Sequence, residues 1–369
     1  MKKEKGRLLS LDTLRGFDMS FIMGGELVII YIASIFPESI FSVVAEQMRH
    51  TAWDGFTFYD LIFPLFLFLA GVSFPFSLSK QLLQGKSKGD ISLRVIKRGM
   101  TLLFLGIVYN GLLQFDFANL RYASVLGRIG LAWMFASLLY VWLKRSHLLI
   151  FSLTTLLGYW AVSALVLAPD ATAGTSSLSI NGSLVGYIDR NFLPGVLHDG
   201  IHDPEGLLST LPAIITALAG IFTGEFIRSR NIENGYKKVA IMLLAALTLL
   251  AIGYIWDIVL PINKNLWSSS FVCCTSGWSL LLFSLFYLVI DVIGFRKWTM
   301  PLRVIGMNSI TIYLAQQFID FNKPVNTIFG GLIKLLPDDF YTLGYWCSYF
   351  LVCWILLYFL YRKKIFLKV

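Results

Sequence analysis

The sequence predicts an all-α protein, a polytopic transmembrane bundle of about 10 membrane-spanning helices. Hydrophobic residues make up 56% of the 369 residues and charged residues only 14%, whereas soluble proteins average about 25% charged residues. The mean hydropathy is +0.70. This composition excludes a disordered chain, a soluble enzyme with a single membrane anchor and a small disulfide-bonded secreted domain.

Apolar runs of about 20 residues, the length that crosses a bilayer, define the expected spans. They cover residues 14–36, 58–79, 95–113, 122–143, 148–168, 206–228, 237–260, 267–293, 302–319 and 343–361. The first run follows a basic start but carries two carboxylates, so we expect a retained helix and no cleaved signal peptide. The run 324–336 is shorter and contains two adjacent glycines. We therefore expect a re-entrant or interfacial segment there.

The distribution of Lys and Arg predicts the orientation, because cytoplasmic loops are enriched in them. With ten spans, 24 Lys and Arg residues fall on the side of both termini and 7 on the other side, so both termini are expected in the cytoplasm. In a soluble protein the net charge of +9 would suggest a nucleic-acid partner. Here the loops explain the charge, and no nucleic acid is expected.

Carboxylates in or near the spans are the first candidates for a functional site. They are Asp18, Glu26, Asp60 and Asp257. A charge at mid-bilayer costs about 2.5–3.5 kcal/mol, so such residues either serve a function or fix helix packing through ion pairs. The sequence leaves both readings open. Arg121 and Arg128 are seven residues apart, hence on one helix face, and are the expected outer-side partners.

His50 is the strongest single candidate. It lies just before the second span, in the stretch RHTAWDGFTFYD at 49–60. Imidazole titrates near neutrality and can accept a proton from an attacking amine or hydroxyl. If the stretch is helical, Asp54 shares a face with His50 and can orient it. The alternative is an ordinary polar loop histidine.

Two outer-side loops offer further polar clusters. His198, Asp199, His202 and Asp203 suggest metal ligands. Their confinement to one loop with a proline argues against a metal-binding geometry, so no metal is expected. The loop 261–270 places amide and hydroxyl groups beside Trp267, a combination that suits a carbohydrate and equally a capped helix start. The cysteines, Cys273, Cys274, Cys347 and Cys353, are read as core residues.

Six blocks in order along the chain match a known pattern. They are SLDTLRGFD at 10–18 with GGE at 24–26, HTAWDGFTFYDLIFP at 50–64, the segment 121–130, DPEGLLST at 203–210, PINKNLWSSS at 261–270 and IGMNS at 305–309. They resemble the heparan-α-glucosaminide N-acetyltransferase family, in particular its bacterial inner-membrane members. The resemblance implies a multi-pass acyltransferase in the inner (cytoplasmic) membrane. It would move acetyl from cytoplasmic acetyl-CoA to the amine of a glucosamine-type sugar on the periplasmic side.

The resemblance also implies roles for individual residues. The family's catalytic histidine corresponds to His50, as base or acetyl carrier. Lysosomal members have a catalytic asparagine in the first span; this chain has Glu26 there, which suggests a second acid/base or an acceptor holding His50.

Residue chemistry and resemblance together give the expected site. The catalytic set is His50, Glu26, Asp54 and Asp60; the acceptor set is Trp53, His198, Asp203, Glu205, Asn263, Lys264 and Trp267; the acetyl-CoA set is Arg15, Asp18, Lys97, Arg98 and Asn308. We expect a single domain over 1–369, with the outer loop 169–205 covering the acceptor site.

Two other classes of protein compete with this reading. A proton-coupled secondary transporter of sugars or small peptides could use the same carboxylates, but no inverted repeat is visible. A polytopic scaffold leaves the residues around His50 unexplained. Expected partners are acetyl-CoA, an amino sugar or a glycan containing one, and the lipid bilayer. The oligomeric state is open, with a homodimer as one alternative.

Overall fold

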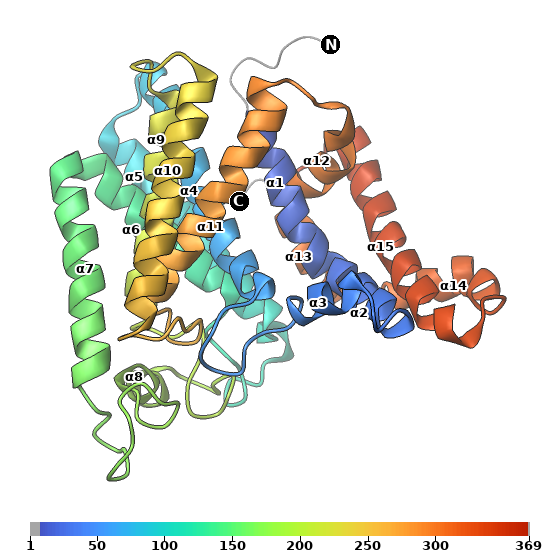
Figure 1. The fold of residues 1–369 in the computed structure, drawn as a ribbon, viewed down its shortest axis with the longest axis horizontal. Helices are drawn as coiled ribbons and strands as arrows, with labels where there is room; N and C mark the ends of the chain where they lie inside the picture. Colours follow the sequence, from blue (N-terminus) through green and yellow to red (C-terminus); the bar gives the residue numbers. More distant parts are fainter. Residues whose placement is uncertain (1–7, 368–369) are drawn as a thin grey trace. The chain divides into compact units, whose positions relative to one another are not determined.

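The structure, a computed structural model, describes residues 8–367 and confirms the all-α fold (Figure 1). Within this range the regular elements are helices, and the β-structure consists of two isolated bridges. Eight helices of the described part are long and apolar enough to cross a membrane. The chain is therefore a multi-pass membrane protein. The basic residues Lys2, Lys3, Lys5, Arg7 and Lys368, which enter the orientation argument, lie outside the described residues.

The longest irregular connections of the described residues lie between α7 and α9, on either side of α8. Their bounds are α1 Leu9–Ser20, η1 Phe21–Gly25, α2 Glu26–Ile35, α3 Ile40–Glu46, α4 Phe58–Leu83, α5 Lys88–Tyr109, η2 Leu112–Gln114, α6 Val125–Trp142, α7 Arg145–Leu165, α8 Leu184–Phe192, α9 Thr210–Arg228, α10 Gly235–Asp257, α11 Ser269–Tyr287, η3 Leu288–Val292, η4 Lys297–Thr299, α12 Met300–Gly306, α13 Ser309–Phe318, α14 Asn322–Ile333 and α15 Asp338–Arg362.

Helices occupy all ten expected spans, but two of them differ from a simple apolar crossing. Helix α5 begins at Lys88, and charged side chains occupy its first half. The expected span 302–319 is divided at Met307–Asn308 into α12 and α13, each too short to cross about 30 Å of hydrocarbon alone. Over 324–336 the structure has α14, whose 12 residues reach about 18 Å. That length agrees with the expectation of no full crossing there.

Contacts divide the chain into two compact units. Unit 1 contains the described residues up to His50, Thr57–Ile62 and those from Leu285 onward. Its helices α1 and α12 cross at two glycines: a Cβ on Gly16 would lie 1.7 Å from the carbonyl oxygen of Leu302, and one on Gly306 would lie 2.0 Å from that of Asp12. The crossing therefore requires glycine.

The buried core of unit 1 joins the first span to the C-terminal helices. It contains Met19, Met23, Val304, Ile305, Ile312, Phe321, Cys353 and Leu357. The first span bends at Gly24, whose φ of 110° falls in the region that glycine adopts readily. This bend ends the π-helical turn η1 just before Glu26, and π-helical turns are frequent at functional sites.

Unit 2 contains Thr51–Phe56 and Phe63–Ser284. Its helices also pack through glycines: a Cβ on Gly71 of α4 would lie 2.3 Å from the carbonyl oxygen of Ala217, and one on Gly220 of α9 would lie 2.0 Å from that of Phe68. In Figure 1, α7 lies at the edge of this unit, and α8 with the irregular segments around it gathers at one end of its helices. The candidate residues of unit 2 lie largely at that end.

Candidate active site

His50 is paired with a buried carboxylate in unit 1. Its Nδ1 atom lies 2.7 Å from Oδ1 of Asp60. The Asp60 side chain is 1% exposed and that of His50 is 48% exposed. A carboxylate facing Nδ1 favours the tautomer that carries its proton there, which makes Nε2 the basic ring nitrogen. The pair therefore has the arrangement of an oriented general base with access to solvent.

Asp60 holds this position because it also caps helix α4. It is the third residue of the helix, and its Oδ2 accepts the backbone N–H of Thr57 at 3.1 Å. The Thr57 hydroxyl lies 3.0 Å from the same oxygen and 2.7 Å from the carbonyl oxygen of Arg49. A carboxylate at this position is also favoured by the helix dipole. One oxygen of Asp60 thus starts the helix and the other orients His50.

Two further contacts fix the segment before His50 against α4. The backbone N–H of Tyr59 donates to the carbonyl of Gln47 at 3.0 Å, and that of Phe58 donates to the Gln47 side chain at 3.1 Å. The ring of Tyr59 lies 4.7 Å from that of His50, centroid to centroid. The imidazole is therefore held on one side by Asp60 and packed on another by Tyr59.

Helix α1 meets the start of α4 through aromatic rings. Phe58 lies 5.0 Å from Phe21 and 6.3 Å from Phe17, both nearly edge to face. On the same span, Glu26 lies within electrostatic range of Tyr59. Tyr59 therefore packs its ring on His50 and also interacts electrostatically with Glu26. It lies near both of these expected catalytic residues.

The other carboxylate of the first span, Asp18, is deeply buried. It is 1% exposed, and neither of its carboxylate oxygens has a hydrogen-bond partner among the described residues. One oxygen of Glu26, Oε2, is likewise buried without a partner in this range. Buried polar groups are normally satisfied, so packing alone does not explain these two carboxylates.

The segment between His50 and Thr57 is not helical, so the condition under which Asp54 would share a face with His50 is not met. Gly55 has a φ of 115°, and its N–H donates to the carbonyl of Ile262 at 2.8 Å. Within unit 2, Oδ1 of Asp54 accepts Nδ2 of Asn263 at 3.1 Å. In the structure the partner of His50 is therefore Asp60, and Asp54 instead binds the loop 261–270.

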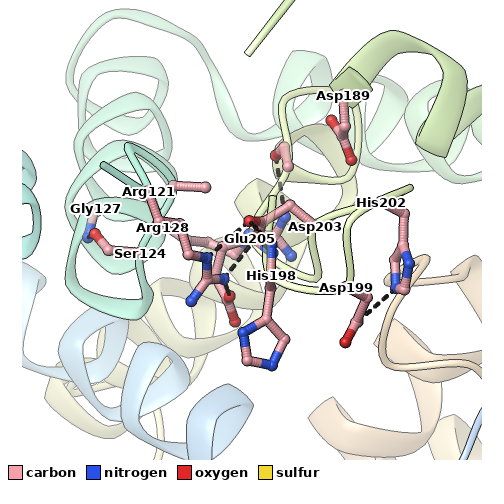
Figure 2. Close-up of polar contacts among 12 residues, drawn as sticks. Arg121, Ser124, Gly127, Arg128, Asp189, His198, Asp199, His202, Asp203 and Glu205 are labelled. Atoms are coloured by element: carbon pink, nitrogen blue, oxygen red, sulfur yellow. Dashed lines mark hydrogen bonds and ion pairs between the residues drawn. The ribbon is translucent and has the colours of Figure 1, made fainter. Parts of the chain in front are cut away.

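Arg121 forms the centre of a charged cluster in unit 2 (Figure 2). Its Nε and Nη2 bind the two oxygens of Asp203 at 2.7 and 2.6 Å, and Nη2 also binds Glu205. The backbone N–H groups of His198 and Glu205 also donate to the carboxylate oxygens of Asp203. The sequence predicts Arg121 on a helix and paired with carboxylates of the spans. In the structure Arg121 precedes α6, and its partners come from the long outer loop.

Arg128 is buried at 2% exposure, in α6. Its Nη2 donates to the carbonyl of Gly206 at 3.0 Å and to the hydroxyl of Ser209. Its guanidinium lies 5.0 Å from the ring of Trp267. Among the described residues its Nε and Nη1 have no hydrogen-bond partner. Arg121 and Arg128 together fasten the segment 203–209 to the start of α6.

The two histidines of the long loop differ in their surroundings. His202 is 2% exposed; its Nε2 lies 3.2 Å from Asp199, and its ring meets that of Trp53 edge to face at 5.1 Å. His198 is exposed, and in Figure 2 its imidazole points away from Asp203. Because Asp203 faces Arg121, these residues do not converge, and the described residues contain no group of three potential metal ligands.

Burial and charge shift the pKa values in this cluster. Burial alone would raise the pKa of Asp203, but the hydrogen bonds from Arg121 outweigh it and hold the pKa below its ordinary value of 3.8. Burial lowers the pKa of His202 below 6.5, against the opposing effect of Asp199. Burial raises the pKa of Asp189 to about 6, although the N–H of Leu207 opposes this. At neutral pH the cluster therefore holds a neutral His202 and an ionised Asp203.

The remaining acceptor candidates lie around the loop 261–270. Trp267 is completely buried, packed against Phe63 and Phe271. Asn263 is also buried and shapes the loop through its hydrogen bonds, whereas Lys264 is half-buried. Trp53 donates from Nε1 to the carbonyl of Leu178 at 2.9 Å. In this structure Trp267 offers no exposed ring face, and its role in acceptor binding stays a prediction.

The residues expected to contact acetyl-CoA are distributed over both units. In unit 1, Nη1 of Arg15 lies 3.8 Å from Oδ1 of Asp12. Asn308 is 2% exposed, and its Nδ2 has no hydrogen-bond partner among the described residues. In unit 2, Arg98 stacks on Trp133 at 4.5 Å. Lys97 instead lines a pocket of about 370 Å³ with Gly85, Lys86, Asp90, Leu93 and Arg94. Three cations against one carboxylate make this pocket suited to phosphate.

Several residues of the site escaped sequence reasoning. Thr57 and Gln47 were missed, although Thr57 with Asp60 three residues later has the spacing of a helix cap. Tyr59 was not assigned a role, because its contact with His50 depends on the turn between them. The pairing of Arg121 with Asp203, 82 residues away, left no local signal.

Comparison with known proteins places this geometry in context. No protein-family model matches the chain. The heparan-α-glucosaminide N-acetyltransferase of Homo sapiens is 27% identical over 87% of this chain and 56% of its own length. That of Mus musculus is 26% identical over 74% of this chain and 49% of its own length. The chain is similar to these N-acetyltransferases. It spans about half the length of the curated relatives it matches.

Proposed function

We propose that the chain is a transmembrane N-acetyltransferase that transfers acetyl from acetyl-CoA to the amine of a glucosamine-type sugar. The observation that carries the proposal is the His50–Asp60 pair, in a chain similar to N-acetyltransferases over most of its length. An amine attacks a thioester readily once it is unprotonated and held beside it. A solvent-accessible imidazole oriented by a buried carboxylate supplies the base for that step.

In the direct route, Nε2 of His50 accepts a proton from the amine as its nitrogen bonds to the thioester carbonyl carbon. The C–S bond then breaks, and the departing sulfur takes up the proton to leave as the CoA thiol. In the alternative route, Nε2 attacks the thioester carbonyl carbon, the C–S bond breaks and CoA leaves as a thiolate. The amine then displaces the imidazole from the acetyl group, and the proton that the amine loses is taken up by the CoA thiolate. Asp60 has the same role in both routes, because it stabilises the charged imidazole and fixes its orientation.

Glu26 is proposed as the second acid/base group of this site. Its Oε2 is buried without a partner among the described residues, and it lies within electrostatic range of Tyr59, whose ring packs on His50. A carboxylate so placed can take up the proton that a sugar ammonium group must lose before its amine attacks. Asp54, held by Asn263, is proposed to shape the acceptor side of the site.

The pocket that Lys97 lines is proposed to receive the phosphates of CoA. Lys86, Arg94 and Lys97 supply the positive charge there, and phosphates bind best to such clusters. In the orientation that the Lys and Arg distribution predicts, the pocket lies on the cytoplasmic side. We further propose, from the resemblance to the bacterial members of the family, that the membrane is a bacterial inner membrane and that the acceptor lies on its periplasmic side. Arg15, Asp18, Arg98 and Asn308 remain proposed contacts for the rest of the molecule.

The long outer loop is proposed to cover the acceptor. Asp203 is fully engaged by Arg121 and two backbone N–H groups, so it acts by holding the loop. His198 and Lys264 retain accessible surface and are the proposed contacts for sugar hydroxyl groups. The side chain of Glu205 is only 7% exposed and is bound to Arg121, so it is proposed to help Asp203 hold the loop beside the acceptor. Trp53 supports the loop through its bond to Leu178 and its contact with His202.

The test is mass spectrometry of products formed by the purified protein with acetyl-CoA and a panel of amino sugars. We expect N-acetylated glucosamine-type products, which His50→Ala abolishes. The matched control is His147→Ala, since His147 is exposed near the start of α7 and has no role in the proposed reaction. Full transfer by His50→Ala would overturn the assignment of the base. Sugar uptake into proteoliposomes without any acetylated product would favour the transporter instead.

A further inference from the structure

Helices α7, α9 and α10 of unit 2 enclose an apolar groove that the proposed reaction does not use. It has a volume of about 400 Å³. Its walls come from α7 and α10, with Leu156 and Leu249 among their residues, and its floor from α9, with Ala219 and Phe222. Arg145, the first residue of α7, is the charged residue of its lining. The groove is thus apolar along its length and cationic at one end.

Helix α7 is held at both ends of this groove. Toward its C-terminus, the carbonyl of Leu156 accepts the hydroxyl of Ser269 at 2.7 Å, and the hydroxyl of Tyr159 donates to the carbonyl of Leu266. At its N-terminus, Nη1 of Arg145 lies 3.6 Å from Oε2 of Glu225. The space between these attachments is therefore maintained by polar contacts at its ends, without side chains that fill it.

The length of the groove matches one leaflet of a bilayer. From Arg145 to Leu156 is 11 residues, and on α9 the lining runs over the same number, from Ile215 to Phe226, which corresponds to about 16 Å of helix. The hydrocarbon core is about 30 Å thick, so a leaflet is about half of that. An occupant that fills the groove thus reaches from the membrane surface to the midplane.

Charge selects among occupants of that length. Arg145 sits at the surface end of the groove with Lys144 next to it in the chain, and its guanidinium also lies 5.8 Å from the ring of Phe222. Glu225 neutralises part of this charge, but the surface end remains basic. We infer that the groove binds one acyl chain of an anionic glycerophospholipid, with its phosphate at Arg145, in the leaflet where α7 begins.

The experiment titrates the purified full-length chain with palmitoyl-oleoyl phosphatidylglycerol in a mild detergent and counts bound lipid by native mass spectrometry. Ala245 lines the groove, whereas Ala251, on the same helix and also exposed, does not. We expect Ala245→Phe to weaken binding about tenfold by filling the groove, and Ala251→Phe to leave it unchanged. Equal binding by the two variants would overturn the inference.

The charge at the groove end is tested separately with phosphatidylcholine, a zwitterionic lipid, as the second probe. Arg145→Gln should weaken binding of phosphatidylglycerol about fivefold and that of phosphatidylcholine less, because the choline cation offsets the charge of its phosphate. Arg145→Lys should largely restore the preference for phosphatidylglycerol. Equal binding of both lipids by the unmodified chain would refute the anionic occupant. So would a tightly retained neutral lipid, or a second copy of the chain bound in place of lipid.

Discussion

Nδ1 of His50 lies 2.7 Å from Oδ1 of Asp60, and the second oxygen of the same carboxylate accepts the N–H of Thr57 at the start of α4. A single buried side chain therefore connects an exposed imidazole to the first turn of a membrane-spanning helix.

Asp60→Asn should lower kcat of the proposed acetyl transfer by about 10²- to 10⁴-fold, because an amide at this position no longer fixes the productive tautomer of His50 or stabilises its charged form. The measurement is steady-state kinetics at saturating acetyl-CoA over a range of pH. Asp90 is the corresponding capping residue of α5, so the thermal stability of Asp90→Asn calibrates how much of any loss comes from the cap alone. Unchanged kcat in Asp60→Asn would contradict the orienting role.

Thr57→Val should reduce kcat more than it raises the KM for acetyl-CoA. The substitution removes the hydroxyl that lies near both Asp60 and the carbonyl of Arg49 but keeps the N–H that Asp60 accepts. Loss of a cap hydroxyl costs about 1 kcal/mol, so a decrease of about fivefold is expected if that energy positions the carboxylate. Thr57→Ser should restore the rate; a valine variant with full activity would show that the hydroxyl only supports folding.

The stability of the outer loop should depend on pH in opposite directions through two residues. The lowered pKa of His202 means that its contribution is lost as the pH falls below 6.5, because the unfolded state then binds the proton more readily. The raised pKa of Asp189, about 6, means that its destabilising effect is present above that pH and is relieved as the pH falls. In the unmodified chain the two effects partly cancel.

Single substitutions should reveal them between pH 7.5 and pH 5, measured by hydrogen exchange of residues 185–209. With His202→Gln the loop should become more protected on acidification, and with Asp189→Asn it should become less protected. The double variant is the control, and its protection should change least. The same direction of change in both single variants would be inconsistent with these pKa shifts.

Gly306→Ala should destabilise unit 1, because its Cβ would lie 2.0 Å from the carbonyl oxygen of Asp12 and force α1 and α12 apart. An overpacked site costs about 1–3 kcal/mol. The matched control is Gly330→Ala in α14, where a Cβ meets nothing within 4 Å and where alanine should be neutral or slightly stabilising. Thermal unfolding of the purified variants is the measurement, and equal midpoints would contradict the requirement for glycine at the crossing.

Hydropathy predicted the positions of the helices because a membrane demands long apolar runs, and helices are found at every expected span. The division of 302–319 at Met307–Asn308 was not predicted, since a break within an apolar run leaves the composition unchanged. The start of α5 at Lys88 was not predicted either. Its first turns carry charged residues, so a search for apolar runs begins the span later than the helix does.

At the candidate site, residue types were easier to predict than their partners. His50 stands out through its neighbours in sequence, but the choice between Asp54 and Asp60 depends on backbone conformation. Gly55 adopts a positive φ, which breaks the helical spacing that would have favoured Asp54. The contact of Arg121 with Asp203 links residues far apart in the chain, and a single sequence holds no record of such a pairing.

The double use of Asp60 has a consequence for how the protein is made. The carboxylate reaches its place only when the first turn of α4 has formed, and at that moment it also aligns the imidazole of His50. Maturation of the proposed base is therefore completed by insertion of the second span and needs no separate step. A nascent chain in which α4 has not yet formed carries an unaligned histidine. We therefore expect no acetyl transfer before the second span is inserted.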